Sequence, residues 1–498
     1  MDRVVFRNFA INFTGMALPA FVSLVTVPLY IHLLGVERYG VLQLVGICVA
    51  YLAVLDLGMG VATEKHVSRA RAAPADGATP QIARVVWSAL WTNLATGIAG
   101  GILFYVAAHW SLPFLSRLPA SQHQEVLDTL PWLAASIPVA NLSTVCAATV
   151  SGSQRFALLT SCQTIGTFLE QLLPLVSIWL IGPTLPAVFG TIVVVRLATF
   201  LALVLAMLNT LRLREVLRPH LPAARDLFRY GCWIALAAVV VAITETLDTA
   251  FLGALLGASF VTFYAVPQTL VARLGMLPLS LTRTLFPRLV TCDRAQADVM
   301  VQKSMRFLTG LYTPIALVAM FAIGPFLDIW VGHELSRIST PIGHMLIVAV
   351  WFAGQGNLLR VLIQAQIRPS IVARLSLFEL PFLVIALWLG ISWFGLAGAT
   401  GVAVMRALSE YTILLLLSRV HARAIVADML LHLVFLVTGL VLASVITTWP
   451  ALGSVGVLLV AVDFGISLYR SPALRERIAA ILARLGLWET IKAGRSDL

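Results

Sequence analysis

The chain has 498 residues, of which 59% are hydrophobic and only 11% are charged. Soluble domains carry about 25% charged residues, so a chain this apolar needs lipid as its main solvent, and a soluble function is excluded. The net charge of +11 does not indicate nucleic-acid binding, because the basic residues lie in short loops between apolar runs and no nucleic-acid motif accompanies them.

The apolar runs predict fourteen transmembrane helices. Each run reaches the roughly 20 residues that a helix needs to cross a bilayer. Backbone groups in lipid must be satisfied internally, so runs of this length predict helices. In chain order the predicted helices cover residues 9–33, 40–63, 85–109, 127–150, 158–181, 184–208, 230–254, 260–287, 305–331, 341–365, 371–391, 394–418, 425–448 and 451–469. The predicted fold class is therefore an all-α polytopic membrane protein.

Lysine and arginine are divided unevenly between the two sides of this topology. If the N-terminus is cytoplasmic, then the N-terminus, the even-numbered loops and the tail hold 26 of the 34 basic residues, and the odd-numbered loops hold three. Basic residues gather on the cytoplasmic side of membrane proteins. The bias predicts an even number of spans with both termini in the cytoplasm.

Two stretches of the chain look like copies of one six-helix unit. Glu170 in the fifth predicted helix precedes Arg196 in the sixth by 26 residues, and Glu379 in the eleventh precedes Arg406 in the twelfth by 27 residues. Six helices return the chain to the same side, so the copies are parallel, and transporters of this kind place the substrate between their halves. The expected organisation is two six-helix bundles, two additional transmembrane helices and a cytoplasmic amphipathic tail, over residues 1–210, 211–420, 421–470 and 471–498.

Several short motifs follow one another along these helices. They are Tyr30-Ile-His-Leu-Leu-Gly-Val-Glu-Arg-Tyr-Gly40, Leu55-Asp56-Leu57-Gly58-Met59-Gly60, Ser151-Gly-Ser-Gln-Arg-Phe156, Phe263-Tyr264-Ala-Val-Pro267-Gln268, Leu285-Phe286-Pro287-Arg288 and Ile329-Trp330-Val331-Gly332. Together, their order and spacing resemble the polysaccharide-repeat (Wzx-like) flippases of the multidrug/oligosaccharidyl-lipid/polysaccharide exporter superfamily. The resemblance extends from the first through the twelfth helix, and the count of fourteen helices also agrees with that family.

The resemblance implies two six-helix bundles around a central cavity, in the bacterial inner membrane. It implies a flippase that moves undecaprenyl-diphosphate-linked oligosaccharides from the cytoplasmic to the periplasmic leaflet for O-antigen or exopolysaccharide synthesis. The expected partners are the lipid-linked oligosaccharide, the bilayer, and the glycan polymerase and chain-length regulator proteins. No cofactor is expected, and a coupling ion, proton or sodium, is left open.

Five arginines lie inside predicted spans, where a charge is costly and marks a candidate functional site, when Arg306 and Arg374 in the first turns of their spans are counted with the adjoining cytoplasmic loops. A guanidinium group binds phosphate bidentately, so these arginines are the candidate substrate-binding cations of a cavity that receives an anionic head group. Two of them lie near the cytoplasmic ends of their helices, where snorkelling to the interface is the alternative. The five are Arg196, Arg273, Arg283, Arg360 and Arg406, and the two near helix ends are Arg283 and Arg360.

Three glutamates in the spans have a structural interpretation. Glu170 and Glu379 are placed to neutralise the arginines of their own repeat. Glu410 lies four residues after Arg406 on the same helix face, so it is an alternative partner for that arginine.

Three further acids are candidates for ion coupling or gating. Glu245 and Asp248 are three residues apart and share a helix face, where two close carboxylates can exchange a proton or bind sodium. The alternative is that they pair with an arginine of the next helix. Asp56 lies near the cytoplasmic end of the second predicted helix, where it fixes a helix end or a gate.

Missing motifs narrow the class of protein. The chain has no P-loop, no HExxH zinc motif and no nucleophile elbow, and we expect a transporter rather than an enzyme. The alternatives are a cation-coupled drug antiporter of the same superfamily, which needs an acidic cavity, and a flippase for the peptidoglycan lipid precursor. A membrane glycosyltransferase or polymerase is the alternative from another class, but the largest outside loop, near 110–126, is too short for its periplasmic domain.

Overall fold

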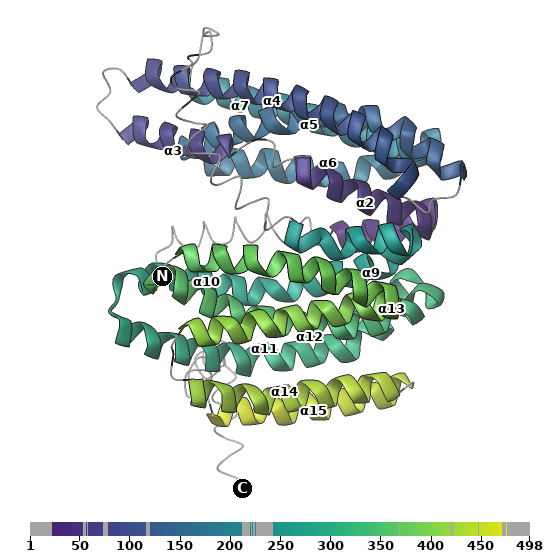
Figure 1. The fold of residues 1–498 in the computed structure, drawn as a ribbon, viewed down its shortest axis with the longest axis vertical. Coiled ribbons are helices and arrows are strands. Elements are labelled where there is room, and N and C mark those ends of the chain that lie inside the picture. The colour runs from purple at the N-terminus through teal and green to yellow at the C-terminus, as the bar shows by residue number, and fades with distance from the viewer. Residues whose placement is uncertain are drawn as a thin grey trace, which may run out of the picture. The chain divides into compact units, whose positions relative to one another are not determined.

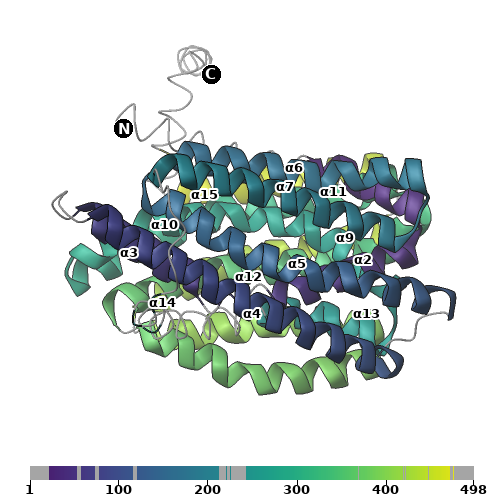
Figure 2. The same ribbon diagram turned by 90° about the horizontal axis from the view of Figure 1, so that it is seen from above.

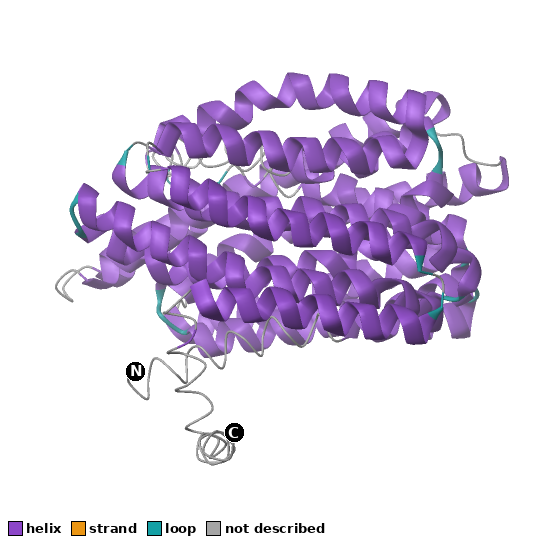
Figure 3. Cartoon of the chain, turned by 90° about the horizontal axis from the view of Figure 1, so that it is seen from below, coloured by secondary structure: helices purple, strands orange, loops and turns teal. Residues whose placement is uncertain are grey.

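The fold is that of a computed structural model of the chain. It describes residues 22–52, 56, 58–72, 78–115, 120–211, 220, 222, 225, 243–367, 369–418, 420, 422–446, 448–470 and 475. All regular structure in those residues is helical, and Figure 3 shows helices joined by short loops without a strand. Ten of the described helices are long and apolar enough to cross a membrane. The predicted fold class, an all-α polytopic membrane protein, is confirmed.

The helices belong to two compact units, Met1–Thr262 and Phe263–Leu498. In unit 1, α5 packs on α3, α4 and α7, and Figures 1 and 2 show α4 to α7 running lengthwise beside one another. Met59, Val86, Val145 and Met207 form part of its buried core, one from each of α3, α4, α5 and α7. The helices of unit 1 are Val22–Leu34, α2 (Val36–Leu52), α3 (Met59–Ala72), α4 (Ala78–Leu115), α5 (Ala120–Gly152), α6 (Phe156–Ile181), α7 (Leu185–Leu211), a helix over 243–255 and the start of α9 (Ala258–Val271).

Unit 2 is built around α12, the most buried of the described spans. It packs on α10, α11 and α13, and the Trp351 indole at its centre donates a hydrogen bond to the Thr313 hydroxyl of α11 at 3.0 Å. The last two helices, α14 and α15, pack on α11. After the remainder of α9, the helices of unit 2 are η2 (Ala272–Gly275), α10 (Met276–Thr291), α11 (Arg294–Val331), α12 (His333–Gln366), α13 (Pro369–Ser418), α14 (Ala422–Val445) and α15 (Trp449–Arg470).

Helix α13 contains two of the predicted spans, folded into a hairpin. Its backbone leaves helical geometry at Gly395, where φ is +58°, a conformation that glycine adopts without the steric cost of a Cβ. The two arms, residues 369–394 and 396–418, approach so closely that a Cβ on Gly398 would overlap the carbonyl oxygen of Gly390. The hairpin therefore depends on small residues at its turn, and it brings side chains of both arms to one place.

The second predicted helix, 40–63, is wrong in one respect, because the structure divides it. Helix α2 ends at Leu52 and α3 begins at Met59, after Gly58 with φ +68°. The Asp56 carboxyl accepts hydrogen bonds from backbone N–H groups at the start of α3 and from the Thr144 hydroxyl of α5. Hydropathy alone does not detect a glycine in the left-handed region or a carboxylate that satisfies the first turn of a new helix.

The predicted amphipathic tail, 471–498, lies outside the described residues except at Arg475. The Arg475 guanidinium donates hydrogen bonds to the carbonyl oxygens of Leu468 and Tyr469, at 3.1 and 2.9 Å. These are carbonyls of the last turn of α15, which lack partners within the helix. Arg475 therefore caps the end of the last described helix.

Candidate functional site

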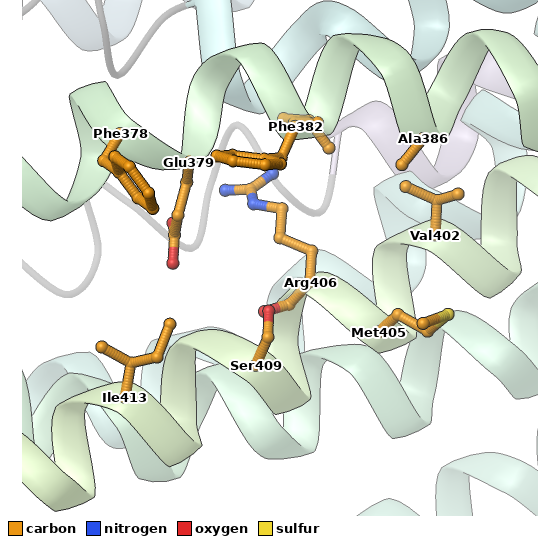
Figure 4. A pocket seen from close by; sticks show the side chains of 10 residues that line it. Phe378, Glu379, Phe382, Ala386, Val402, Met405, Arg406, Ser409 and Ile413 are labelled. Carbon is orange, nitrogen blue, oxygen red and sulfur yellow. The ribbon is translucent and has the colours of Figure 1, made fainter.

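A pocket of about 360 Å³ lies between the two arms of α13. Its lining is mostly apolar and aromatic, with one carboxylate, one guanidinium and one hydroxyl among the apolar groups. We call it the α13 pocket, and its lining residues are Phe378, Glu379, Phe382, Leu383, Ala386, Val402, Met405, Arg406, Ser409 and Ile413 (Figure 4). The spacing of these residues follows the helical repeat on both arms, so each arm contributes one face.

The polar groups of the pocket face each other across the hairpin. Figure 4 shows the Arg406 side chain extending from the second arm to the ring of Phe382 and toward Glu379 on the first arm. The positive charges of Arg406 and Arg360 both act on the Glu379 carboxylate. The Glu379 Oε1 atom is buried and has no hydrogen-bond partner within the described part of the chain. The carboxylate thus lies near two positive charges, and one of its oxygens is left available to a donor.

A second ion pair adjoins the pocket. Arg360 of α12 forms a hydrogen-bonded ion pair with Glu410 of the second arm. The Glu410 side chain is only 13% exposed, so the pair lies mostly inside unit 2. The sequence interpretation offered Arg406 as the partner of Glu410, and the structure instead directs Glu410 to α12 while Arg406 turns to the pocket. We call Arg360, Glu379, Arg406 and Glu410 the unit 2 charge cluster.

In unit 1, the counterparts in the predicted repeat, Glu170 and Arg196, form an ion pair. Arg196 Nε of α7 lies 3.3 Å from Glu170 Oε1 of α6, and both side chains are about 30% exposed or less. One turn away, Gly166 faces Thr199, and a Cβ on that glycine would lie 2.6 Å from the Thr199 hydroxyl. The two helices are therefore held close together next to the pair.

The other predicted cations lie apart from the α13 pocket or outside the description. Arg273 lies in η2 and its side chain is exposed. The backbone of Arg283 belongs to α10, but its side chain is outside the described residues. Of the five predicted cations, the structure thus brings Arg360 and Arg406 into one cluster and pairs Arg196 with its own repeat's glutamate.

The acids predicted for ion coupling lie in the helix over 243–255. Glu245 is exposed, and Asp248 is partly buried. One Asp248 carboxylate oxygen accepts hydrogen bonds from the backbone N–H of Thr249 at 2.7 Å and from its hydroxyl at 3.3 Å. Asp56 holds the start of α3, as described above, so its observed contacts are those of a helix cap.

Two side-chain pairs that join different helices were not predicted from the sequence. Arg38 of α2 forms two hydrogen bonds with the Glu125 carboxylate of α5, at 2.6 and 3.1 Å. His432 of α14 and Asp463 of α15 form a pair at 2.8 Å. The only signal for the second pair was one histidine and one aspartate in two consecutive apolar runs, a pattern that does not specify contact.

Comparison with known proteins identifies relatives over most of the chain. Residues 5–292 match the family described as polysaccharide biosynthesis protein. A Shigella flexneri protein named "Putative O-antigen transporter" is 22% identical over 405 residues, which cover 79% of this chain and 93% of that protein.

Solved structures share the fold. The lipid II flippase MurJ, in an inward closed conformation, aligns with a TM-score of 0.71 at 13% identity, over 92% of this chain and 98% of that chain. An inward-facing multidrug resistance transporter of the MATE family aligns with a TM-score of 0.62 at 14% identity, over 83% of this chain and 98% of that chain. At such low identities the structures show a common fold and leave the substrate open.

Proposed function

Because the chain belongs to the polysaccharide biosynthesis protein family, we propose that it moves lipid-linked oligosaccharide units across the bacterial inner membrane. Its relatives are transporters and flippases, so it is a membrane transporter and not an enzyme. The finer proposal is that the unit is carried on undecaprenyl diphosphate, moves from the cytoplasmic to the periplasmic leaflet, and is passed to a glycan polymerase and its chain-length regulator.

The observation that carries the proposal is the composition of the α13 pocket. An apolar and aromatic surface lies next to the Arg406 guanidinium within one pocket. A polyprenyl diphosphate has the matching parts, since its chain prefers apolar contacts and its diphosphate accepts charge-assisted hydrogen bonds from a guanidinium. The pocket therefore supports an amphiphilic, anionic substrate better than a purely polar one.

Arg406 has a defined role in this proposal. Its guanidinium turns from the Glu379 carboxylate and binds a phosphate of the substrate. Meanwhile the Arg360–Glu410 pair holds α12 against the second arm. Sugar hydroxyls are donors that fit the unpartnered Oε1 of Glu379. The charge cluster can thus contact both the diphosphate and the first sugar.

The test is the sidedness of lipid-linked units in cells. Deleting the protein should leave the units facing the cytoplasm and remove the surface polysaccharide, and Arg406→Gln should cause the same defect in part, at normal protein level. Arg155→Gln is the matched control, because Arg155 is an exposed arginine immediately before α6, outside the pocket. Normal surface polysaccharide in a clean deletion would contradict the proposal.

A second candidate, transport of a cationic amphiphile, is favoured by the presence of Glu379 in the same pocket. Its buried carboxylate is an acceptor suited to a drug cation. The two candidates make opposite predictions for two variants. Glu379→Gln should abolish transport of a cation and spare most transport of an anionic glycolipid. Arg406→Gln should reduce transport of the anionic glycolipid and spare most transport of a cation.

A further inference from the structure

Two titratable side chains meet inside the pair of helices that follows the predicted repeat. His432 Nδ1 of α14 lies 2.8 Å from Asp463 Oδ1 of α15, and the side chains are 5% and 0% exposed. Figure 1 shows α14 and α15 side by side, and both pack on α11. Ionisable groups inside a membrane span are costly, and a pair retained there is a candidate site in its own right.

Polar atoms around this dyad have unused hydrogen-bonding capacity. Asp463 Oδ2 is buried and has no hydrogen-bond partner among the described residues, and the same holds for the hydroxyl of Ser467. Ser467 follows Asp463 by one turn on the same face of α15 and is 1% exposed. The carboxylate therefore accepts one hydrogen bond from His432 and retains a second oxygen able to hold a hydrogen.

The charge of the dyad is not balanced by the arginines nearest to it along the helices. Asp428 of α14 engages both, at 2.9 Å from Arg306 Nε of α11 and at 3.1 Å from Arg470 Nη1 of α15. Helix α12 also packs on α14, and two of its ionisable side chains have partners away from the dyad. Arg360 pairs with Glu410, and the imidazole of His344 lies 3.0 Å from the Met320 carbonyl oxygen. A neutral imidazole beside an ionised carboxylate leaves a net charge of about −1 in an apolar environment.

Partly exposed charged side chains lie near the dyad at one end of the helix pair. Asp428 precedes His432 by four residues and lies on the same face of α14. Its side chain is 21% exposed, and that of its partner Arg470 is 50% exposed. Asp428 is thus about one helical turn, or about 6 Å along the axis, from His432.

From these contacts we propose that His432 and Asp463 form a proton-binding site, loaded from the end of α14 and α15 where Asp428 and Arg470 lie. One proton from water joins the pair and a hydroxide remains in solution. The occupied site is neutral, as imidazolium with carboxylate or as imidazole with carboxylic acid, which are two arrangements of the same proton. Occupancy holds α14 and α15 together on α11, and loss of the proton leaves a buried charge that weakens this packing.

This inference concerns the helices outside the repeat and does not depend on the substrate proposed above. Nitrogen-15 NMR of histidine-labelled full-length protein in lipid nanodiscs provides the direct test. One imidazole signal, absent from His432→Gln, should shift as the pH is raised, because the imidazole changes its charge when the site loses its proton. Asp463→Asn should move or abolish that titration. An unchanging His432 signal across the pH series would overturn the proposal.

His344→Gln is the matched control. It removes a second buried histidine of unit 2, whose ring contacts a backbone carbonyl instead of an acid. It should delete a different NMR signal and leave the titration of His432 unchanged. If His344→Gln abolishes the same titration, the assignment of the site to His432 and Asp463 is overturned.

Thermal unfolding gives a second readout that needs no substrate. The wild-type melting temperature should fall when the pH is raised through the titration, and Asp463→Asn should lose most of that fall, because it carries no charge at either pH. Ser467→Ala, which keeps both members of the dyad, serves if Asp463→Asn does not fold, and it should displace the midpoint of the fall. Identical pH profiles for wild type and both variants would contradict the proposal.

Discussion

The two acid–arginine pairs of the predicted repeat have different surroundings in the two units. In unit 1, Glu170 and Arg196 meet directly at 3.3 Å. In unit 2, the equivalent Glu379 and Arg406 border a pocket, and one oxygen of Glu379 has no hydrogen-bond partner in the described residues.

Unit 2 has a further ion pair beside these residues. Glu410 pairs with Arg360 of α12, and the Arg406 side chain extends into the pocket toward Phe382 and Glu379. Position 200, which matches Glu410 in the repeat, is Phe200 in unit 1. The proposal therefore assigns binding to the unit 2 pair, beside which Arg360 and Glu410 join α12 to the second arm of α13.

The largest effect, on stability, is expected from removing Glu410, the acid of the Arg360–Glu410 pair. Glu410→Ala leaves Arg360 largely buried without its carboxylate, which should lower the free energy of unfolding by about 3 kcal/mol, the low end for a broken buried pair because Arg360 is 31% exposed. Thermal or denaturant unfolding in detergent measures the loss. The double variant Arg360→Leu with Glu410→Leu should recover most of it. A double variant as unstable as the single one would argue against an unpaired charge as the cause.

A smaller effect, on transport, is expected from the repeated arginines. Arg406→Gln should reduce transport of the lipid-linked unit about tenfold or more, since a hydrogen bond to a charged group contributes about 1.5–3 kcal/mol. Arg196→Gln should reduce transport much less at equal protein level. The rates are compared in vesicles that contain the purified protein. Equal losses in the two variants would remove the functional distinction between the units.

The smallest effect is expected from the unit 1 acid. Glu170→Gln should cost about 1 kcal/mol or less in stability, because the pair is nearly a third exposed and the amide still accepts a hydrogen bond from Arg196. A shift of the melting temperature measures it, with Glu410→Gln as the parallel variant in unit 2. A larger cost for Glu170→Gln than for Glu410→Gln would reverse the comparison.

Much of the fold follows from hydropathy and charge. Long apolar runs predict the described spans, and the 26-residue separation of Glu170 and Arg196 places both in one helical hairpin, where they meet. These features depend on contacts between neighbours in the chain. The sequence therefore contains enough local information to predict them.

The parts that could not be predicted depend on packing between distant helices. Arg360 and Glu410 are 50 residues apart, and nothing in either helix indicates which face α12 presents to α13. His432 and Asp463 pose the same difficulty across α14 and α15. The break before α3 depends on the backbone conformation of Gly58, which hydropathy does not encode.

The most direct test of the account is photolabelling of the full-length protein with a polyprenyl diphosphate that carries a light-activated group. Labelled peptides should come from the two arms of α13, among Phe378–Phe382 and Val402–Ile413, and the labelling should fall about tenfold in Arg406→Gln but remain in Arg196→Gln. Labelling that avoids α13, or that is equally strong in both variants, would contradict the assignment of the pocket to the substrate.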